Sequence, residues 1–166
     1  MKLLRLNKPG MNYLKSLISF LLIANFAYAQ DKATESTDFK ALVDNKTFVF
    51  GAQSANPMRA RTVHLSPGYT IKVSPDTVIA DLPYYGRSYS APMNPSDTGI
   101  KFTSSDFTYT VKDRKKNGWD VAIKAKDGTR SHQIFLTISA NGSSSARVLS
   151  SDKESISFDG YIQKTP

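Results

Sequence analysis

Residues 107–148 read FTYTVKDRKKNGWDVAIKAKDGTRSHQIFLTISANGSSSARV, and apolar side chains alternate with polar ones along most of this stretch. An alternation with a period of two residues is typical of strands that bury one face. Asn-Gly or Asp-Gly pairs interrupt the pattern at three places, and such pairs favour tight hairpin turns. The stretch therefore predicts three consecutive antiparallel hairpins.

The middle hairpin turns at Asp127-Gly128. A two-residue type I′ turn at this pair places apolar residues of the two strands opposite one another: Trp119 with Leu136, Val121 with Ile134, and Ile123 with His132. Opposite residues lie on the same face of a sheet, so the apolar sides of both strands coincide. Turn chemistry and hydrophobic pattern therefore agree for this hairpin.

The two outer hairpins each fit a loop of three residues, Lys116-Asn117-Gly118 and Ala140-Asn141-Gly142. A shorter turn at Asn117-Gly118 would place basic side chains opposite apolar ones, whereas the three-residue loops bring apolar residues together. The predicted pairs are Tyr109 with Ala125, Val111 with Ile123, Leu136 with Ala146, and Ile134 with Val148. The last residue of such a loop adopts the left-handed conformation, so we expect positive φ at Gly118 and Gly142.

The first 29 residues are typical of a secretory signal peptide. Four basic residues precede an apolar run over residues 17–27, and Ala27-Tyr28-Ala29 offers small residues at the two cleavage positions. The run is short for a membrane span, although an uncleaved anchor is the alternative, and Met11 is an alternative start to Met1. We expect cleavage after Ala29, a flexible tether over residues 30–37, and a single β-rich domain over residues 38–166.

The charge and cysteine content of the mature chain limit its class. All four basic residues before residue 29 leave with the leader, so the net charge falls from +8 to +4 and gives little reason to expect a nucleic-acid partner. The chain has no cysteine, so it has no disulfide framework and no thiol for a lipid anchor. These features predict an exported protein, periplasmic or secreted, that is not a lipoprotein and has no transmembrane segment after cleavage.

The rest of the chain adds a short helix and more strands. Asp38 can cap a helix over residues 38–45, and strands are expected over residues 47–52, 61–65, 69–73, 77–82, 100–104 and 156–162. Pro75 favours a four-residue turn that pairs Val73 with Val78. Eight to ten strands with mostly short loops predict a mainly β fold, in which one antiparallel meander curls into a barrel or deeply curved sheet, lipocalin-like in outline. A two-sheet β-sandwich is the alternative.

Four short motifs resemble the family known as domain of unknown function 4251. They are Phe48-Val49-Phe50, Leu82-Pro83-Tyr84-Tyr85-Gly86-Arg87-Ser88-Tyr89, Gly99-Ile100-Lys101-Phe102 and Ile156-Ser157-Phe158-Asp159-Gly160-Tyr161-Ile162. The resemblance covers about residues 39–163, and Leu-Pro-Tyr-Tyr-Gly-Arg is its most specific part. Members of that family are exported bacterial proteins, many of them associated with the envelope, and many carry a lipoprotein cysteine that this chain lacks. The resemblance implies export and a related fold, and it implies no activity.

Tyr84, Tyr85, Arg87 and Tyr89 are the best candidates for ligand contact. They lie close together in the longest irregular segment, residues 83–98. Tyrosines offer flat faces and hydroxyls, and the guanidinium of Arg87 fits a carboxylate, a phosphate or a sugar hydroxyl. The alternative is structural, with Gly86 permitting a tight corner and the tyrosines covering one end of the barrel.

His132 is a further ligand candidate, because it falls on the apolar face of the hairpins and could line a cavity. It and His64 are the only histidines, without metal-ligand spacing, so no metal site is expected. The sequence contains no Gly-x-Ser-x-Gly elbow, no obvious carboxylate pair and no Gly-rich phosphate loop. We therefore expect no catalytic residues, no cofactor and no enzymatic activity. The basic tip 112–116 is expected to be a solvated turn rather than a nucleic-acid site.

Two functions remain open. The first is a non-catalytic binding module that holds a small apolar or glycan-like ligand. The second is an envelope interaction or structural protein with a filled core that docks a protein partner. Small or polar residues around an internal cavity would favour the first function, and complete filling by side chains would favour the second.

Overall fold

The computed structural model describes residues 38–89, 99–115 and 117–165, which form one short helix and ten strands. The expected leader 1–29, the tether 30–37 and residues 90–98 of the irregular segment lie outside the described residues. The helix is α2 (Phe39–Asp44). The strands are β1 (Phe48–Pro57), β2 (Val63–His64), β3 (Thr70–Val73), β4 (Val78–Leu82), β5 (Ile100–Ser104), β6 (Phe107–Asp113), β7 (Gly118–Asp127), β8 (Arg130–Ser139), β9 (Ser143–Ser150) and β10 (Lys153–Lys164).

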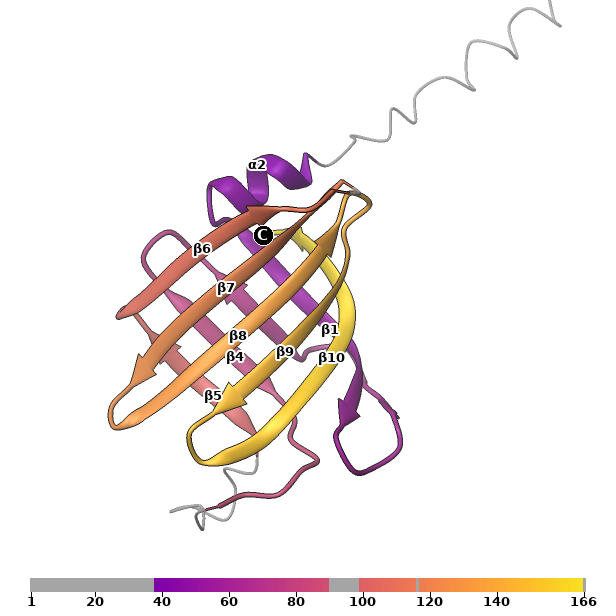
Figure 1. Ribbon diagram of the computed structural model, residues 1–166, viewed down its shortest axis with the longest axis vertical. Helices are drawn as coiled ribbons and strands as arrows, with labels where there is room; N and C mark the ends of the chain where they lie inside the picture. Colours follow the sequence, from indigo (N-terminus) through magenta and orange to yellow (C-terminus); the bar gives the residue numbers. More distant parts are fainter. Residues whose placement is uncertain (1–37, 90–98, 116, 166) are drawn as a thin grey trace, which may run out of the picture. The chain divides into compact units, whose positions relative to one another are not determined.

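The strands form one antiparallel sheet that nearly closes into a barrel. Their order is β5-β4-β3-β1-β10-β9-β8-β7-β6, with β2 paired to β1, so the two outermost strands are consecutive in the chain. Figure 1 shows β6–β10 in front and β1, β4 and β5 behind them. A corner joins β5 to β6, and there the buried Ser104 hydroxyl lies 2.6 Å from the carbonyl oxygen of Lys126 and 3.0 Å from that of Asp106. The curved meander is therefore confirmed, and the two-sheet sandwich is not formed.

The predicted faces of the three hairpins are confirmed, and so are two of the predicted registers, that of β8 with β9 and that of β3 with β4. Leu136 pairs with Ala146, as expected, and Gly142 at the β8–β9 turn has φ +83°. Val73 pairs with Val78 across the four-residue turn between β3 and β4. The side chains expected on the inner face are buried or partly buried, including His132.

The register predicted for β7 and β8 is wrong by two residues. The observed loop is Gly128-Thr129, and Asp127 pairs with Arg130. Gly128 alone has positive φ (+58°), which matches a type II′ turn rather than type I′. This register pairs Ile123 with Ile134, and a smaller residue, Ala125, lies opposite His132. Large apolar side chains thus meet one another, which explains why this register is preferred.

The register predicted for β6 and β7 is also wrong by two residues, because the three-residue loop begins one residue earlier than predicted, directly after Arg114. Val111 pairs with Val121, the amide of Arg114 donates to the Gly118 carbonyl at 3.0 Å, and Asn117 rather than Gly118 has positive φ (+49°). Gly118 is required for a different reason. A β carbon at this position would lie 2.4 Å from the carbonyl oxygen of Ile138 on β8.

β1 is longer than predicted because a bulge lets it continue past Gln53. The register with β10 shifts between Ala52 and Ser54, so Ala55 again points inward and is fully buried. On its other side, β1 pairs first with β3 and then with β2. A strand was expected over residues 61–65, and only its two residues Val63–His64 form β2.

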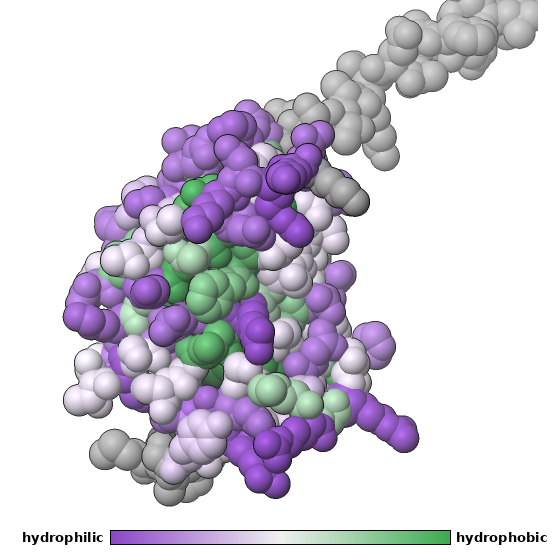
Figure 2. Space-filling model, in the orientation of Figure 1, coloured by the Kyte–Doolittle hydropathy of each residue, from purple (hydrophilic) through white to green (hydrophobic). Residues whose placement is uncertain are grey.

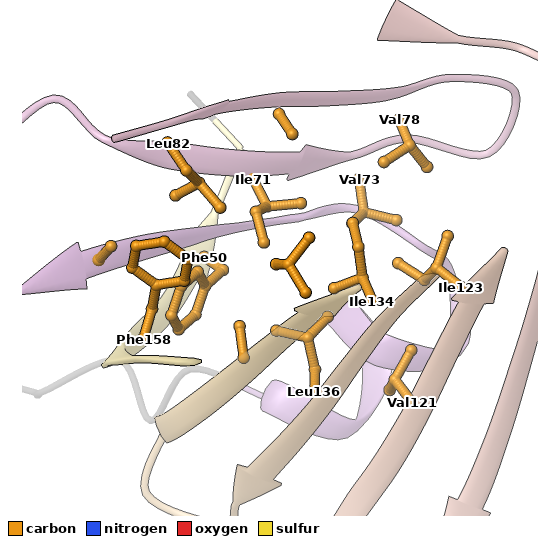
Figure 3. Close-up of a cluster of buried hydrophobic side chains, with 14 of the residues drawn as sticks. Phe50, Ile71, Val73, Val78, Leu82, Val121, Ile123, Ile134, Leu136 and Phe158 are labelled. Atoms are coloured by element: carbon orange, nitrogen blue, oxygen red, sulfur yellow. The ribbon is translucent and has the colours of Figure 1, made fainter. Parts of the chain in front are cut away.

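Side chains from both halves of the sheet fill the interior. Figure 3 shows Phe50, Ile71 and Leu82 facing Ile134 and Leu136, with Phe158 beside Phe50. The largest residues that are less than 2% exposed come from six strands and α2: Phe48, Phe50, Phe158, Ile71, Leu82, Ile123, Ile134, Leu136, Ile138, Ile156, Val43 and Val73. The interior is therefore a packed core over its central part.

The predicted helix is confirmed as α2, and it lies at one end of the sheet (Figure 1). The Asp38 carboxylate accepts a hydrogen bond from the Ala41 amide at 3.1 Å, which is an N-cap. Leu42 and Val43 are buried in the core, and the Tyr109 hydroxyl donates to the Val43 carbonyl at 2.8 Å. Within the described residues, no helix is long and apolar enough to span a membrane.

Candidate functional site

The segment from Tyr84 to Tyr89 lies against the turn between β9 and β10. The Tyr89 amide donates to the Asp152 carbonyl at 2.8 Å, and the Glu154 amide donates to the Arg87 carbonyl at 2.9 Å. Ser88 forms an isolated β-bridge with Lys153 between these two bonds. The backbone of this irregular segment is thus held like a short edge strand, at the opposite end of the sheet from α2 (Figure 1).

Tyr84 braces this segment and is structural. Its hydroxyl lies 2.6 Å from the Arg87 carbonyl oxygen and 3.0 Å from that of Glu154, and its ring packs against the core. Burial, with the nearby Glu154 carboxylate, raises the pKa of Tyr84 to about 12. A β carbon on Gly86 would lie 2.5 Å from the Tyr84 hydroxyl, so Gly86 is needed for this brace. The structural alternative therefore applies to Tyr84.

Tyr85, Arg87 and Tyr89 instead project into solvent. The side chains of Tyr85 and Tyr89 are 42% and 71% exposed, and Arg87 is exposed and forms no ion pair with a described residue. Because the backbone is already fixed, binding does not have to order it, and aromatic and arginine side chains tend to dominate binding energy. This trio, which we call the loop trio, is the part of the predicted site that is available to a partner.

The turn between β9 and β10, which holds this loop, carries a cluster of charged side chains. Lys153 Nζ lies 2.8 Å from the Asp152 carboxylate, and the two side chains are only 10% and 15% exposed. Arg59 pairs with Glu154 at 3.2 Å. Burial alone would raise the pKa of Asp152, but hydrogen bonds from Lys153 and Ser150 outweigh it and lower this pKa to about 2. Asp152 is therefore a carboxylate at neutral pH.

His132 lies inside the barrel and is 4% exposed. Its ring stacks on Phe102 with a centroid distance of 4.1 Å, and its Nδ1 lies 3.0 Å from Ser150 Oγ. The Ser150 hydroxyl donates to the Asp152 carboxylate, so the proton of the other bond must come from His132 Nδ1. His132 is thereby connected to the support of the loop through Ser150 and Asp152.

This chain of contacts is not a catalytic triad. The serine lies between the histidine and the aspartate, and its proton points to the carboxylate rather than to the imidazole. Burial lowers the pKa of His132, which keeps the ring neutral, and its buried Nε2 has no hydrogen-bond partner among the described residues. The arrangement fits a buried structural network better than nucleophilic chemistry.

Sequence reasoning missed Ser150, Asp152, Lys153 and Glu154. They fall in a polar stretch, SSDKES, whose pattern indicates a turn and nothing more. Their role depends on the approach of a segment far away in the chain. At the basic tip, Arg114 pairs with Asp120 at 3.5 Å and Lys112 and Lys115 are exposed, while residue 116 lies outside the described residues.

Fold and site define a small, mainly β domain with a packed interior and an aromatic loop fixed at one end. The family model for the domain of unknown function DUF4251 matches residues 30–162, and the chain belongs to this family. A crystal structure of a DUF4251 family protein from Bacteroides eggerthii is similar, with a TM-score of 0.59 and 12% identity, covering 80% of this chain and 89% of that one. This likeness supports the fold alone. A search of curated proteins found no significant match.

Proposed function

We propose that this protein is an exported, non-catalytic interaction protein that docks a protein partner through the loop trio, Tyr85, Arg87 and Tyr89. The observation that carries the proposal is the combination of a packed core with exposed side chains on a fixed backbone. Phe50, Ile134 and Leu136 occupy the centre of the barrel, where a small apolar ligand would otherwise lie. Binding is therefore assigned to the outside of the molecule.

The chemistry of the loop trio suggests what the partner surface must offer. Arg87 fits a carboxylate or a pair of backbone carbonyls, and the two tyrosine rings fit apolar or aromatic area. A glycan-like ligand is a second candidate for the same loop, because tyrosine rings offer flat faces to a sugar and Arg87 can donate to its hydroxyls. The compartment belongs to the proposal as well: a periplasmic or secreted protein, cut after Ala29 and without a lipid anchor.

The proposal is tested by cross-linking the exported protein to its neighbours in intact cells and quantifying the captured proteins. The double variant Tyr85→Ala with Arg87→Ala should lose specific capture at least about tenfold, equivalent to about 1.4 kcal/mol. The matched control is Lys112→Ala with Lys115→Ala, which removes two exposed cations from the opposite end of the molecule.

Thermal unfolding separates binding from folding in this experiment. Tyr85 and Arg87 are exposed, so their double variant should keep the unfolding midpoint of the parent. If the lysine variant loses as much capture as the loop variant, or if the loop variant unfolds, the loop is structural and the proposal is wrong.

A further inference from the structure

A groove lies on the outer face of the sheet, where β1 meets β3 and β10. It is an open groove of about 540 Å³, within the range of small-molecule sites. Its lining comes from four strands, β1, β2, β3 and β10, and from the connection between β2 and β3: Gly51, Ala52, Gln53, His64, Leu65, Pro67, Gly68, Tyr69, Thr70, Tyr161 and Gln163. None of the lining residues belongs to the loop trio.

The connection 65–69 between β2 and β3 builds one wall of this groove. Where β1 changes partners from β3 to β2, the Leu65 amide donates to the Gln53 carbonyl at 2.8 Å, and the Ala52 amide donates to the Tyr69 carbonyl at 2.9 Å. These two bonds fix both ends of the connection 65–69. Gly68, with φ +121°, lets the connection turn between them. The wall is therefore held by the backbone of the sheet itself.

Gly51 provides the floor of the groove. It pairs with Tyr161 on one side and with Thr70 on the other, so these three residues form one row across the outer face. A β carbon on Gly51 would lie 3.6 Å from Cζ of Tyr161, so the end of the tyrosine ring leans over the glycine. Tyr161 is 42% exposed in spite of this contact. The end of the Tyr161 ring therefore lies against a glycine that has no side chain of its own.

The lining chemistry selects the kind of ligand. The groove contains no Asp, Glu, Lys or Arg, although such residues make up 22% of the chain. It does contain two tyrosines, two glutamines and a threonine, which supply ring surface together with neutral donors and acceptors. An ionic ligand would find no opposite charge here, whereas a sugar ring presents C–H groups to an aromatic face and hydroxyls to amides.

We propose that this groove binds a neutral saccharide, with Tyr161 as the stacking platform and Gln53 and Gln163 as hydroxyl partners. The site is independent of the loop trio, so one can fail without the other. An oligosaccharide can extend along the open groove, since no side chain at Gly51 blocks the path between Tyr161 and the connection 65–69.

The test uses saturation-transfer NMR and calorimetry with maltohexaose, cellohexaose and mannohexaose, and with hexagalacturonate as the anionic counterpart. At least one neutral hexasaccharide should bind with Kd below about 10 mM, and at least about tenfold more tightly than the anionic one. Tyr161→Ala should weaken this binding about tenfold or more. Gly51→Val should do the same by filling the floor, since a β carbon there makes only ordinary contacts.

Phe135→Ala is the matched control, because Phe135 is 43% exposed on β8, on another part of the outer face, compared with 42% for Tyr161. Figure 2 shows hydrophobic residues gathered in the middle of the face formed by the front strands, with hydrophilic ones around them. The proposal is wrong if no neutral hexasaccharide binds, or if Phe135→Ala weakens binding as much as Tyr161→Ala. Equal binding of hexagalacturonate would also overturn it.

Discussion

Truncating Leu136 to alanine tests whether the barrel is packed at its centre. Leu136 is 1% exposed and lies on β8 between Val121 of β7 and Ala146 of β9, which are each 1% exposed. In Figure 3 its side chain points from the front strands toward the interior. Leu136→Ala leaves a void that these neighbours fill only in part, so the free energy of unfolding should fall by about 2–5 kcal/mol. This is a large fraction of the roughly 5–15 kcal/mol that stabilises a domain.

Urea unfolding measures this loss, and the adjacent residue provides its control. With a slope of about 1–3 kcal/mol per M urea, the unfolding midpoint of Leu136→Ala should fall by at least about 0.7 M. Phe135 is the next residue on β8, faces outward and is 43% exposed, so Phe135→Ala should cost less than about 1 kcal/mol. If Leu136→Ala costs no more than Phe135→Ala, the interior is not packed as described, and the assignment of binding to the outer surface loses its basis.

Two further predictions concern a turn and a buried histidine. Gly118→Ala should destabilise the protein more than Gly128→Ala. The new β carbon at residue 118 would lie 2.4 Å from the Ile138 carbonyl oxygen, whereas a β carbon at residue 128 would meet nothing within 4 Å, and only the φ of +58° there disfavours alanine. Equal urea midpoints for the two variants would contradict this prediction. Burial lowers the pKa of His132 below its ordinary 6.5. Below about pH 6.5 the unfolded chain therefore binds a proton at His132 more readily than the folded protein does, so the free energy of unfolding should fall as the pH drops. Urea unfolding at about pH 7.5 and about pH 5.5 should show this loss for the parent and a smaller one for His132→Leu.

The sequence predicts which side chains face the core far better than it predicts which residues pair. Alternation places Val121, Ile123, Ile134 and Leu136 on one face, and the structure confirms this. A register shift of two residues keeps every side chain on its face, so the same pattern fits both the predicted and the observed pairing of β7 with β8. The residues of the turn were the only other guide. Gly128 suits the first central position of the observed type II′ turn as well as the second central position of the predicted type I′ turn.

The sequence predicted which segment carries the candidate site, but not which of its residues are structural and which are exposed. Tyr84 and Tyr85 are identical in sequence terms, yet one braces the loop and the other is exposed. What separates them is the approach of Glu154 and its carbonyl, which no local pattern encodes. The groove over Gly51 was missed for a similar reason, since it depends on a bulge at Gln53 and on three strands that meet there.

Native mass spectrometry of the exported protein tests the central claim most directly, because a ligand held inside a barrel survives gentle purification. A protein with a packed core that binds through its outer surface should show the mass of its polypeptide alone. One small apolar molecule bound per chain, retained until the protein unfolds, would contradict this account and would return the function to a ligand carried within the sheet.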